Sequence, residues 1–120
     1  MAPCTVFVVE DDVDTRDMMG RFLELEGFTV ETAANGKQAL ERLNAGVHPC
    51  VILLDLMMPV MDGWQFRSKQ VSDAALASIP VIVVSAAGKD RISDIQADAY
   101  LSKPVDLERL LAEVTQYCSE

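Results

Sequence analysis

Three short apolar runs constrain the fold of this chain more than any other feature of its sequence. They are Thr5–Val9, Val51–Leu54 and Val81–Val84. Each is too short for a helix and rich in β-branched residues, which is typical of strands buried on both faces of a parallel sheet. Two more polar segments, Thr29–Ala33 and Ala99–Ser102, suit the edge strands of the same sheet. The sequence therefore predicts five strands.

Helical patterns alternate with these strands. The clearest extends from about Asp14 to Glu26, and Gly27 follows it at a position where glycine commonly ends a helix. Two others are Lys37–Leu43 and Leu107–Tyr117. No repeat or linker interrupts the alternation, so we expect one domain over residues 1–120. Right-handed crossovers then predict an α/β fold, a doubly wound parallel sheet with helices on both faces.

Composition narrows the possible functions. Half of the 120 residues are hydrophobic, which is enough for a core without a structural metal. The net charge of −9 would repel a polyanion and argues against direct binding of nucleic acid. No basic leader and no apolar run of about 20 residues is present, so we expect no membrane anchor and a cytoplasmic protein.

The cysteines and the single histidine suggest no site. Cys4, Cys50 and Cys118 are odd in number and lack the paired spacing of a zinc site, which indicates a reduced protein. We interpret them as small buried hydrophobic residues. His48 lies in a loop before a predicted strand, where a solvated side chain is the simplest interpretation.

Polar residues terminate four of the predicted strands. In open parallel sheets, ligands bind beyond the carboxyl ends of the strands, so these residues identify the candidate site. They are Glu10-Asp11-Asp12, Asp55, Ser85 and Lys103-Pro104. The sequence therefore predicts that one edge of the sheet gathers carboxylates, a hydroxyl and an ammonium group.

This set of groups suits phosphoryl chemistry. Clustered carboxylates repel each other unless a cation lies among them, and hard oxygen ligands favour Mg²⁺ or Mn²⁺. Metal binding alone needs neither Lys103 nor Ser85, but both can donate to phosphoryl oxygens. Asp55, central in the sheet, is then the candidate nucleophile that forms an acyl phosphate.

Each residue also has an ordinary structural explanation. Asp12 or Asp14 could cap the first helix, and acidic pairs more often do that than bind metal. Asp55 could be a solvated strand end, Ser85 a turn residue and Lys103 a surface charge. These explanations are better for any one residue alone, but not for all of them together at four strand ends.

Four segments, in their order along the chain, resemble the receiver domains of two-component response regulators. They are Val9-Glu-Asp-Asp12, Leu54-Asp-Leu-Met-Met-Pro-Val-Met-Asp-Gly63, Val84-Ser-Ala86 and Tyr100-Leu-Ser-Lys-Pro104. The resemblance spans nearly the whole chain. It implies the flavodoxin-like strand order 2-1-3-4-5 and a domain that accepts phosphate from a histidine kinase or a histidine phosphotransfer protein.

The resemblance also implies roles for individual residues. Asp55 resembles the phosphorylated aspartate, Asp11 and Asp12 the acidic pair that binds the metal, and Lys103 the pairing cation. The backbone carbonyl of Met57 resembles a metal ligand, and Ser85 and Tyr100 resemble the switch residues. Ala86 resembles the small residue that keeps the site accessible, and Pro59 and Gly63 belong to the loop after the phosphorylated aspartate. The peptide bond between Lys103 and Pro104 is similar to a cis bond in the family.

One region departs from the family pattern. Lys103 follows Ser85 by 18 positions, which is shorter than the usual spacing by about one helical turn. Few apolar residues occur at helical spacing over Ala86–Ala99. We therefore expect a short or irregular fourth helix.

Three functions remain open. The first is a phospho-acceptor signalling module that catalyses only its own phosphorylation and dephosphorylation and acts through protein contacts. The second is a metal-dependent phosphatase with an aspartyl-phosphate intermediate, but such enzymes usually need an aspartate two residues after the nucleophile, where this chain has Met57. The third is a degenerate pseudo-receiver that binds partners without phosphorylation.

Overall fold

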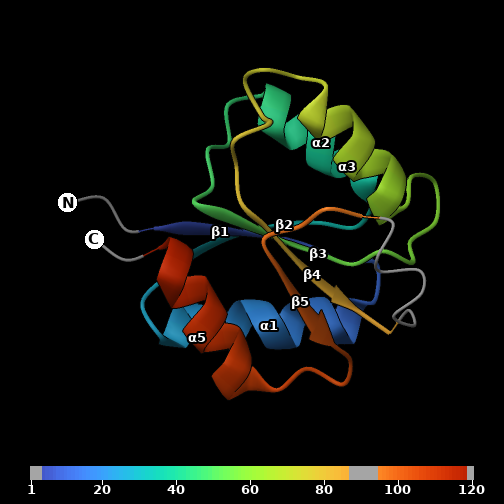
Figure 1. Cartoon of the computed structure of the whole chain (residues 1–120). Helices are drawn as coiled ribbons and strands as arrows, with labels where there is room; N and C mark the ends of the chain where they lie inside the picture. The colour runs from blue at the N-terminus through green and yellow to red at the C-terminus, as the bar shows by residue number, and fades with distance from the viewer. Residues whose placement is uncertain (1–3, 87–94, 119–120) are drawn as a thin grey trace.

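The computed structural model describes residues 4–86 and 95–118. Its five strands are all parallel and lie in the order β2-β1-β3-β4-β5, which confirms the predicted α/β fold (Figure 1). The strands are β1 (Thr5–Val9), β2 (Thr29–Ala33), β3 (Val51–Leu54), β4 (Val81–Ser85) and β5 (Ala99–Ser102). The central strands β1, β3 and β4 are almost entirely buried, as their apolar runs predicted.

Helices cover both faces of the sheet. They are α1 (Val13–Leu25), α2 (Gly36–Asn44), α3 (Gly63–Val71) and α5 (Leu107–Tyr117). Helices α2 and α3 lie on one face, and α1 and α5 lie on the other (Figure 1). Each begins after a side chain that accepts a hydrogen bond from the first turn. The four capping residues are Asp12, Asn35, Asp62 and Asp106.

The alternation of side chains along the strands separates two cores. In β1, Phe7 and Val9 face α2 and α3, whereas Val6 and Val8 face α1 and α5. The helices contribute matching apolar stripes, and in α5 Leu110 and Val114 are fully buried one turn apart. Within the described residues, no helix is long and apolar enough to span a membrane.

The link between β4 and β5 contains the region predicted to hold a short or irregular fourth helix. Most of that region, residues 87–94, lies outside the described residues. The flanking positions Ala86 and Ile95–Asp98 are not helical. Asp98 packs beside the start of β4, because its carboxylate accepts a hydrogen bond of 2.8 Å from the Val81 backbone N–H.

The three cysteines require a correction to the sequence interpretation. Cys50 lies 46 positions after Cys4 and Cys118 lies 114 positions after it, yet the three sulfur atoms are in contact. The implied strand order already made β1 and β3 neighbours, and Cys4 and Cys50 each directly precede one of them. The sequence did not show that the end of α5 would bring Cys118 to the same place. The three residues form a cluster rather than separate hydrophobic positions.

Candidate functional site

The carboxyl ends of β1 and β3 bring three carboxylates together. Glu10 directly follows β1 and Asp55 directly follows β3, and the Asp55 backbone N–H donates to the Val9 carbonyl at 3.0 Å. Carboxylate oxygens of Glu10, Asp11 and Asp55 lie within 4.8 Å of one another. Asp11 is exposed, whereas Glu10 and Asp55 are only 1% and 4% exposed. We call these three residues, with Lys103, the acidic edge.

Lys103 reaches the carboxylates from the far side of β4. Its Nζ lies 2.5 Å from Glu10 Oε1 and 3.5 Å from Asp55 Oδ2. Its backbone N–H donates to the Ser85 carbonyl at 3.1 Å, which holds the end of β5 against β4. The Lys103-Pro104 peptide bond is cis, as the resemblance implied. The predicted meeting of ammonium and carboxylate groups is therefore present.

The charges of the acidic edge depend on each other. Burial raises the pKa of Glu10 to about 7; the hydrogen bond with Lys103 opposes this rise and the nearby Asp55 adds to it. Burial alone would lower the pKa of Lys103, but Glu10 and Asp55 raise it above its ordinary value. Near neutral pH, Lys103 is therefore charged, while Glu10 carries its proton in part of the molecules.

Glu10, rather than Asp12, accompanies Asp11 in this group. Asp12 is the N-cap of α1, and its Oδ2 accepts hydrogen bonds from the Thr15 backbone N–H at 2.9 Å and from the Thr15 hydroxyl. These bonds lower the pKa of Asp12. The structure thus differs from the expected Asp11–Asp12 pair, because the helix begins one residue after Asp12 and takes its carboxylate as a cap. The position of Glu10 directly after β1 was the sequence signal that could have identified it.

The loop after β3 holds the Asp55 side chain by a backbone hydrogen bond. The Met57 backbone N–H donates to Asp55 Oδ1 at 3.3 Å, and the Met57 side chain is half exposed. Gly63 donates its N–H to the Leu56 carbonyl at 3.0 Å. A Cβ on Gly63 would lie 2.6 Å from the Asp55 carbonyl oxygen and 2.8 Å from Leu56 Cα. Gly63 therefore permits a close approach of two backbone segments, which is the loop role that the resemblance implied.

The same loop contains an unusual backbone conformation. Val60 has a φ of +69°, a region that β-branched residues rarely adopt. Its side chain is 75% exposed, and the following residue, Met61, donates its N–H to the Pro59 carbonyl at 2.8 Å. Pro59, Val60 and Met61 thus form a tight turn in the loop between β3 and α3.

The two predicted switch residues lie on neighbouring strands. Ser85 is 1% exposed at the end of β4, and Ala86 follows it at the surface. Tyr100 on β5 is 40% exposed, and its hydroxyl donates to the Ile95 carbonyl and accepts from the Ala97 backbone N–H. Tyr100 is thus bound to the segment between β4 and β5 rather than to the acidic edge.

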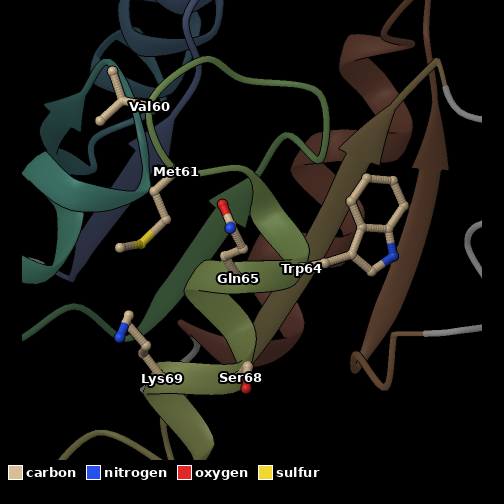
Figure 2. Close-up of a pocket in the computed structure, with 6 residues that line it drawn as sticks. All are labelled: Val60, Met61, Trp64, Gln65, Ser68 and Lys69. Atoms are coloured by element: carbon tan, nitrogen blue, oxygen red, sulfur yellow. The ribbon is translucent and has the colours of Figure 1, made fainter.

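A separate hollow lies beside α3. Val60 and Met61 line it from the preceding loop, and Trp64, Gln65, Ser68 and Lys69 line it from the helix (Figure 2). No residue of the acidic edge is among them. This hollow is therefore a different surface from the predicted site.

The acidic edge fits a hard divalent cation. Its donors are carboxylate oxygens already gathered by the fold, and Mg²⁺ and Mn²⁺ prefer such oxygen ligands. Lys103 supplies a single compensating charge for three carboxylates. A cation here would relieve the remaining repulsion.

Known proteins are similar to this chain in both sequence and fold. Its residues 6–115 match the family described as the response regulator receiver domain. The chain is 39% identical over 117 residues to response regulator Rre1 of Synechocystis sp., covering 93% of this chain and 50% of Rre1. It thus spans about half the length of that relative.

Two solved structures give the same result. Chemotaxis protein CheY4 of Vibrio cholerae is 28% identical with a TM-score of 0.87, covering 97% of this chain and 99% of CheY4. The phosphorylated cyanobacterial phytochrome response regulator RcpA is also 28% identical, with a TM-score of 0.81, covering 96% of this chain and 91% of RcpA. Strand order, acidic edge and sequence similarity agree, and the chain belongs to the response regulator receiver domain family.

Proposed function

We propose that Asp55 accepts a phosphoryl group from a phosphohistidine on a partner histidine kinase or histidine phosphotransfer protein, in the cytoplasm and with a divalent metal. Receiver domains are signalling proteins that act with histidine kinases. The observation that carries the proposal is the position of the Lys103 ammonium, 3.5 Å from a buried Asp55 carboxylate. RcpA, a structural relative, has been solved in a phosphorylated form.

The chain's own groups suit each part of this transfer. A carboxylate oxygen of Asp55 attacks phosphorus, the phosphorus–nitrogen bond to the donor imidazole breaks, and the imidazole leaves as the acyl phosphate forms. Lys103 then pairs with a phosphoryl oxygen, and the Ser85 hydroxyl donates to another. Later attack by water on phosphorus releases phosphate and restores the Asp55 carboxylate. The domain thus catalyses only its own modification.

The metal belongs to the same proposal. Asp11, Asp55 and the Met57 backbone carbonyl would hold Mg²⁺ or Mn²⁺, with Glu10 beside them. Asp12 is less suited, since it caps α1. The bound metal would neutralise negative charge on the phosphoryl oxygens.

The output is proposed to be a change in protein contacts. Movement of Ser85 toward the phosphoryl group would vacate space that Tyr100 could enter. Tyr100 would then lose its hydrogen bonds to Ile95 and Ala97. The signal would therefore reach the surface between β4 and β5.

Intact-mass measurement tests the phosphorylation directly. The protein is incubated with acetyl phosphate and Mg²⁺, and a covalent gain of one phosphoryl group is expected in the wild type. Asp55→Asn should show no gain and keep its fold, because the change is nearly isosteric. Asp17→Asn, an exposed position on α1, is the matched control and should label normally. Labelling of Asp55→Asn would overturn the assignment, and an unlabelled wild type would favour the pseudo-receiver.

A further inference from the structure

The amino ends of the strands hold a second cluster of reactive side chains. Cys4 immediately precedes β1, Cys50 immediately precedes β3, and Cys118 is the C-cap of α5. The three sulfur atoms lie within 4.8 Å of one another. We call these residues the cysteine cluster. It lies at the opposite ends of β1 and β3 from the acidic edge.

Backbone hydrogen bonds hold each cysteine in place. The Cys50 N–H donates to the Thr5 carbonyl at 2.8 Å, and the Cys4 carbonyl accepts from the Thr29 N–H at 3.0 Å. The Cys118 N–H donates to the Val114 carbonyl at 2.9 Å, which continues the buried stripe of α5. The sheet and the helix therefore fix the cluster, rather than a chance contact between chain ends.

Cys4 is the central member of the cluster. Its sulfur contacts the sulfurs of both Cys50 and Cys118. The Cα–Cα distances are 6.2 Å to Cys50 and 5.7 Å to Cys118, and both lie within the range that a disulfide spans. One sulfur can form a disulfide with only one partner at a time. Either bridge is thus geometrically accessible, and the third cysteine stays a thiol.

We propose that the cysteine cluster is a thiol–disulfide redox site in which Cys4 alternates between Cys50 and Cys118 as its disulfide partner. The oxidant is a hydroperoxide. One thiolate attacks its terminal oxygen, the oxygen–oxygen bond breaks, an alcohol or water leaves, and a sulfenic acid remains. A second thiol attacks that sulfur, a disulfide forms and water leaves.

The third thiol can exchange one disulfide for the other. As a thiolate, it attacks the Cys4 sulfur, a new disulfide forms, and the first partner leaves as a thiolate. No net oxidation accompanies this exchange, so no further reactant is needed. Cys118 is 9% exposed, and the other two are partly buried against the same core, so a small peroxide can reach the cluster from its edge.

The two bridges would connect different parts of the molecule. The Cys4–Cys50 bridge ties the amino ends of β1 and β3 together, whereas the Cys4–Cys118 bridge ties β1 to the end of α5. Both close long loops, with separations of 46 and 114 positions, and restrict the unfolded chain. Oxidation should therefore raise the thermal midpoint, and this effect is independent of phosphorylation at Asp55.

Peptide mapping tests the site. The reduced chain is treated with hydrogen peroxide in the presence of a chelator, its remaining thiols are alkylated, and it is digested without reductant. The expected result is one disulfide and one alkylated cysteine per chain, with both the Cys4–Cys50 and the Cys4–Cys118 linked peptides present. Three alkylated cysteines, or bridges only between two chains, would overturn the proposal.

Single variants separate the central cysteine from its partners. Cys50→Ser and Cys118→Ser should each still form one bridge and gain thermal stability upon oxidation. Cys4→Ser should form none at the same peroxide dose and show no gain. Equal bridging in Cys4→Ser would contradict the central role of Cys4. A stoichiometric zinc complex of the reduced chain that resists peroxide would replace the redox site with a metal site.

Discussion

The two ends of β1 and β3 carry opposite kinds of chemistry. At their carboxyl ends, three carboxylates share one ammonium group, and burial raises the pKa of Glu10 to about 7. At their amino ends, three sulfurs pack against an apolar core. The carboxylates repel each other as long as no cation is bound among them. The cysteines are small apolar side chains and pack in the core without such repulsion. The same pair of strands thus has a site with charge repulsion at its carboxyl ends and a site without it at its amino ends.

This difference predicts which properties a substitution at each end will change. Changes at the acidic edge should alter stability, metal affinity and pH dependence together, because these groups share charge. Changes at the cysteine cluster should alter mainly the response to oxidants. Single variants at the two ends, and in the loop between β3 and α3, can break or confirm that separation.

Gly63→Ala should give the largest loss of stability. The new Cβ would meet the backbone of Asp55 and Leu56 at less than 3 Å, and neither can move without disturbing the acidic edge. We expect a loss of about 2–3 kcal/mol of unfolding free energy in chemical denaturation. Gly20→Ala is the control: its Cβ would meet only Val30 Cγ1, at 3.6 Å, and should stabilise α1 by about 0.5–1 kcal/mol. Equal effects would show that Gly63 is not closely packed.

Asp11 and Asp12 should behave differently although they are adjacent. Asp11→Asn should lower Mg²⁺ affinity by about tenfold or more, because one carboxylate of the acidic edge is lost. Asp12→Asn should retain most of the affinity, since the amide oxygen still caps α1. Calorimetric titration with Mg²⁺ measures both. A larger loss in Asp12→Asn would restore the pair that the sequence alone suggested.

These two aspartates also show what the sequence could and could not predict. Asp55 and Lys103 were assigned correctly to one edge because parallel strands align their carboxyl ends, and apolar runs mark those ends. The choice between Glu10 and Asp12 depends on which carboxylate caps α1, and the sequence placed the start of that helix at about Asp14 rather than at Val13. The cysteine cluster was missed because the end of α5 is placed by tertiary packing.

The pH dependence of stability should come from Glu10. Its pKa is about 7 when folded and near 4.5 when unfolded, so the folded state binds the proton more tightly. This contribution is fully present below the unfolded pKa and is lost as pH rises through the folded pKa. From about pH 5 to about pH 8, stability without metal should therefore fall by on the order of 1 kcal/mol.

Two variants locate this effect. Thermal melts in a chelator should show a flatter pH profile for Glu10→Gln, which cannot titrate. The triple variant with serine at all three cysteine positions should keep the wild-type profile, because the cysteine cluster lies at the other end of the sheet. A profile unchanged in Glu10→Gln would mean that another group carries the proton, and the electrostatic contrast between the two ends would fail.

The smallest effect concerns the loop between β3 and α3. Val60 adopts a φ of +69° with an exposed side chain that loses little packing when removed. Val60→Gly should therefore relieve backbone strain of about 1–2 kcal/mol, while glycine's greater freedom when unfolded opposes it by about 0.5–1 kcal/mol. The net expectation is a stabilisation of less than about 1 kcal/mol. Val71→Gly, at an exposed helical position, provides the comparison and should destabilise instead. Chemical denaturation of both variants should give changes of opposite sign; a loss in both would show that the loop bears no strain at Val60.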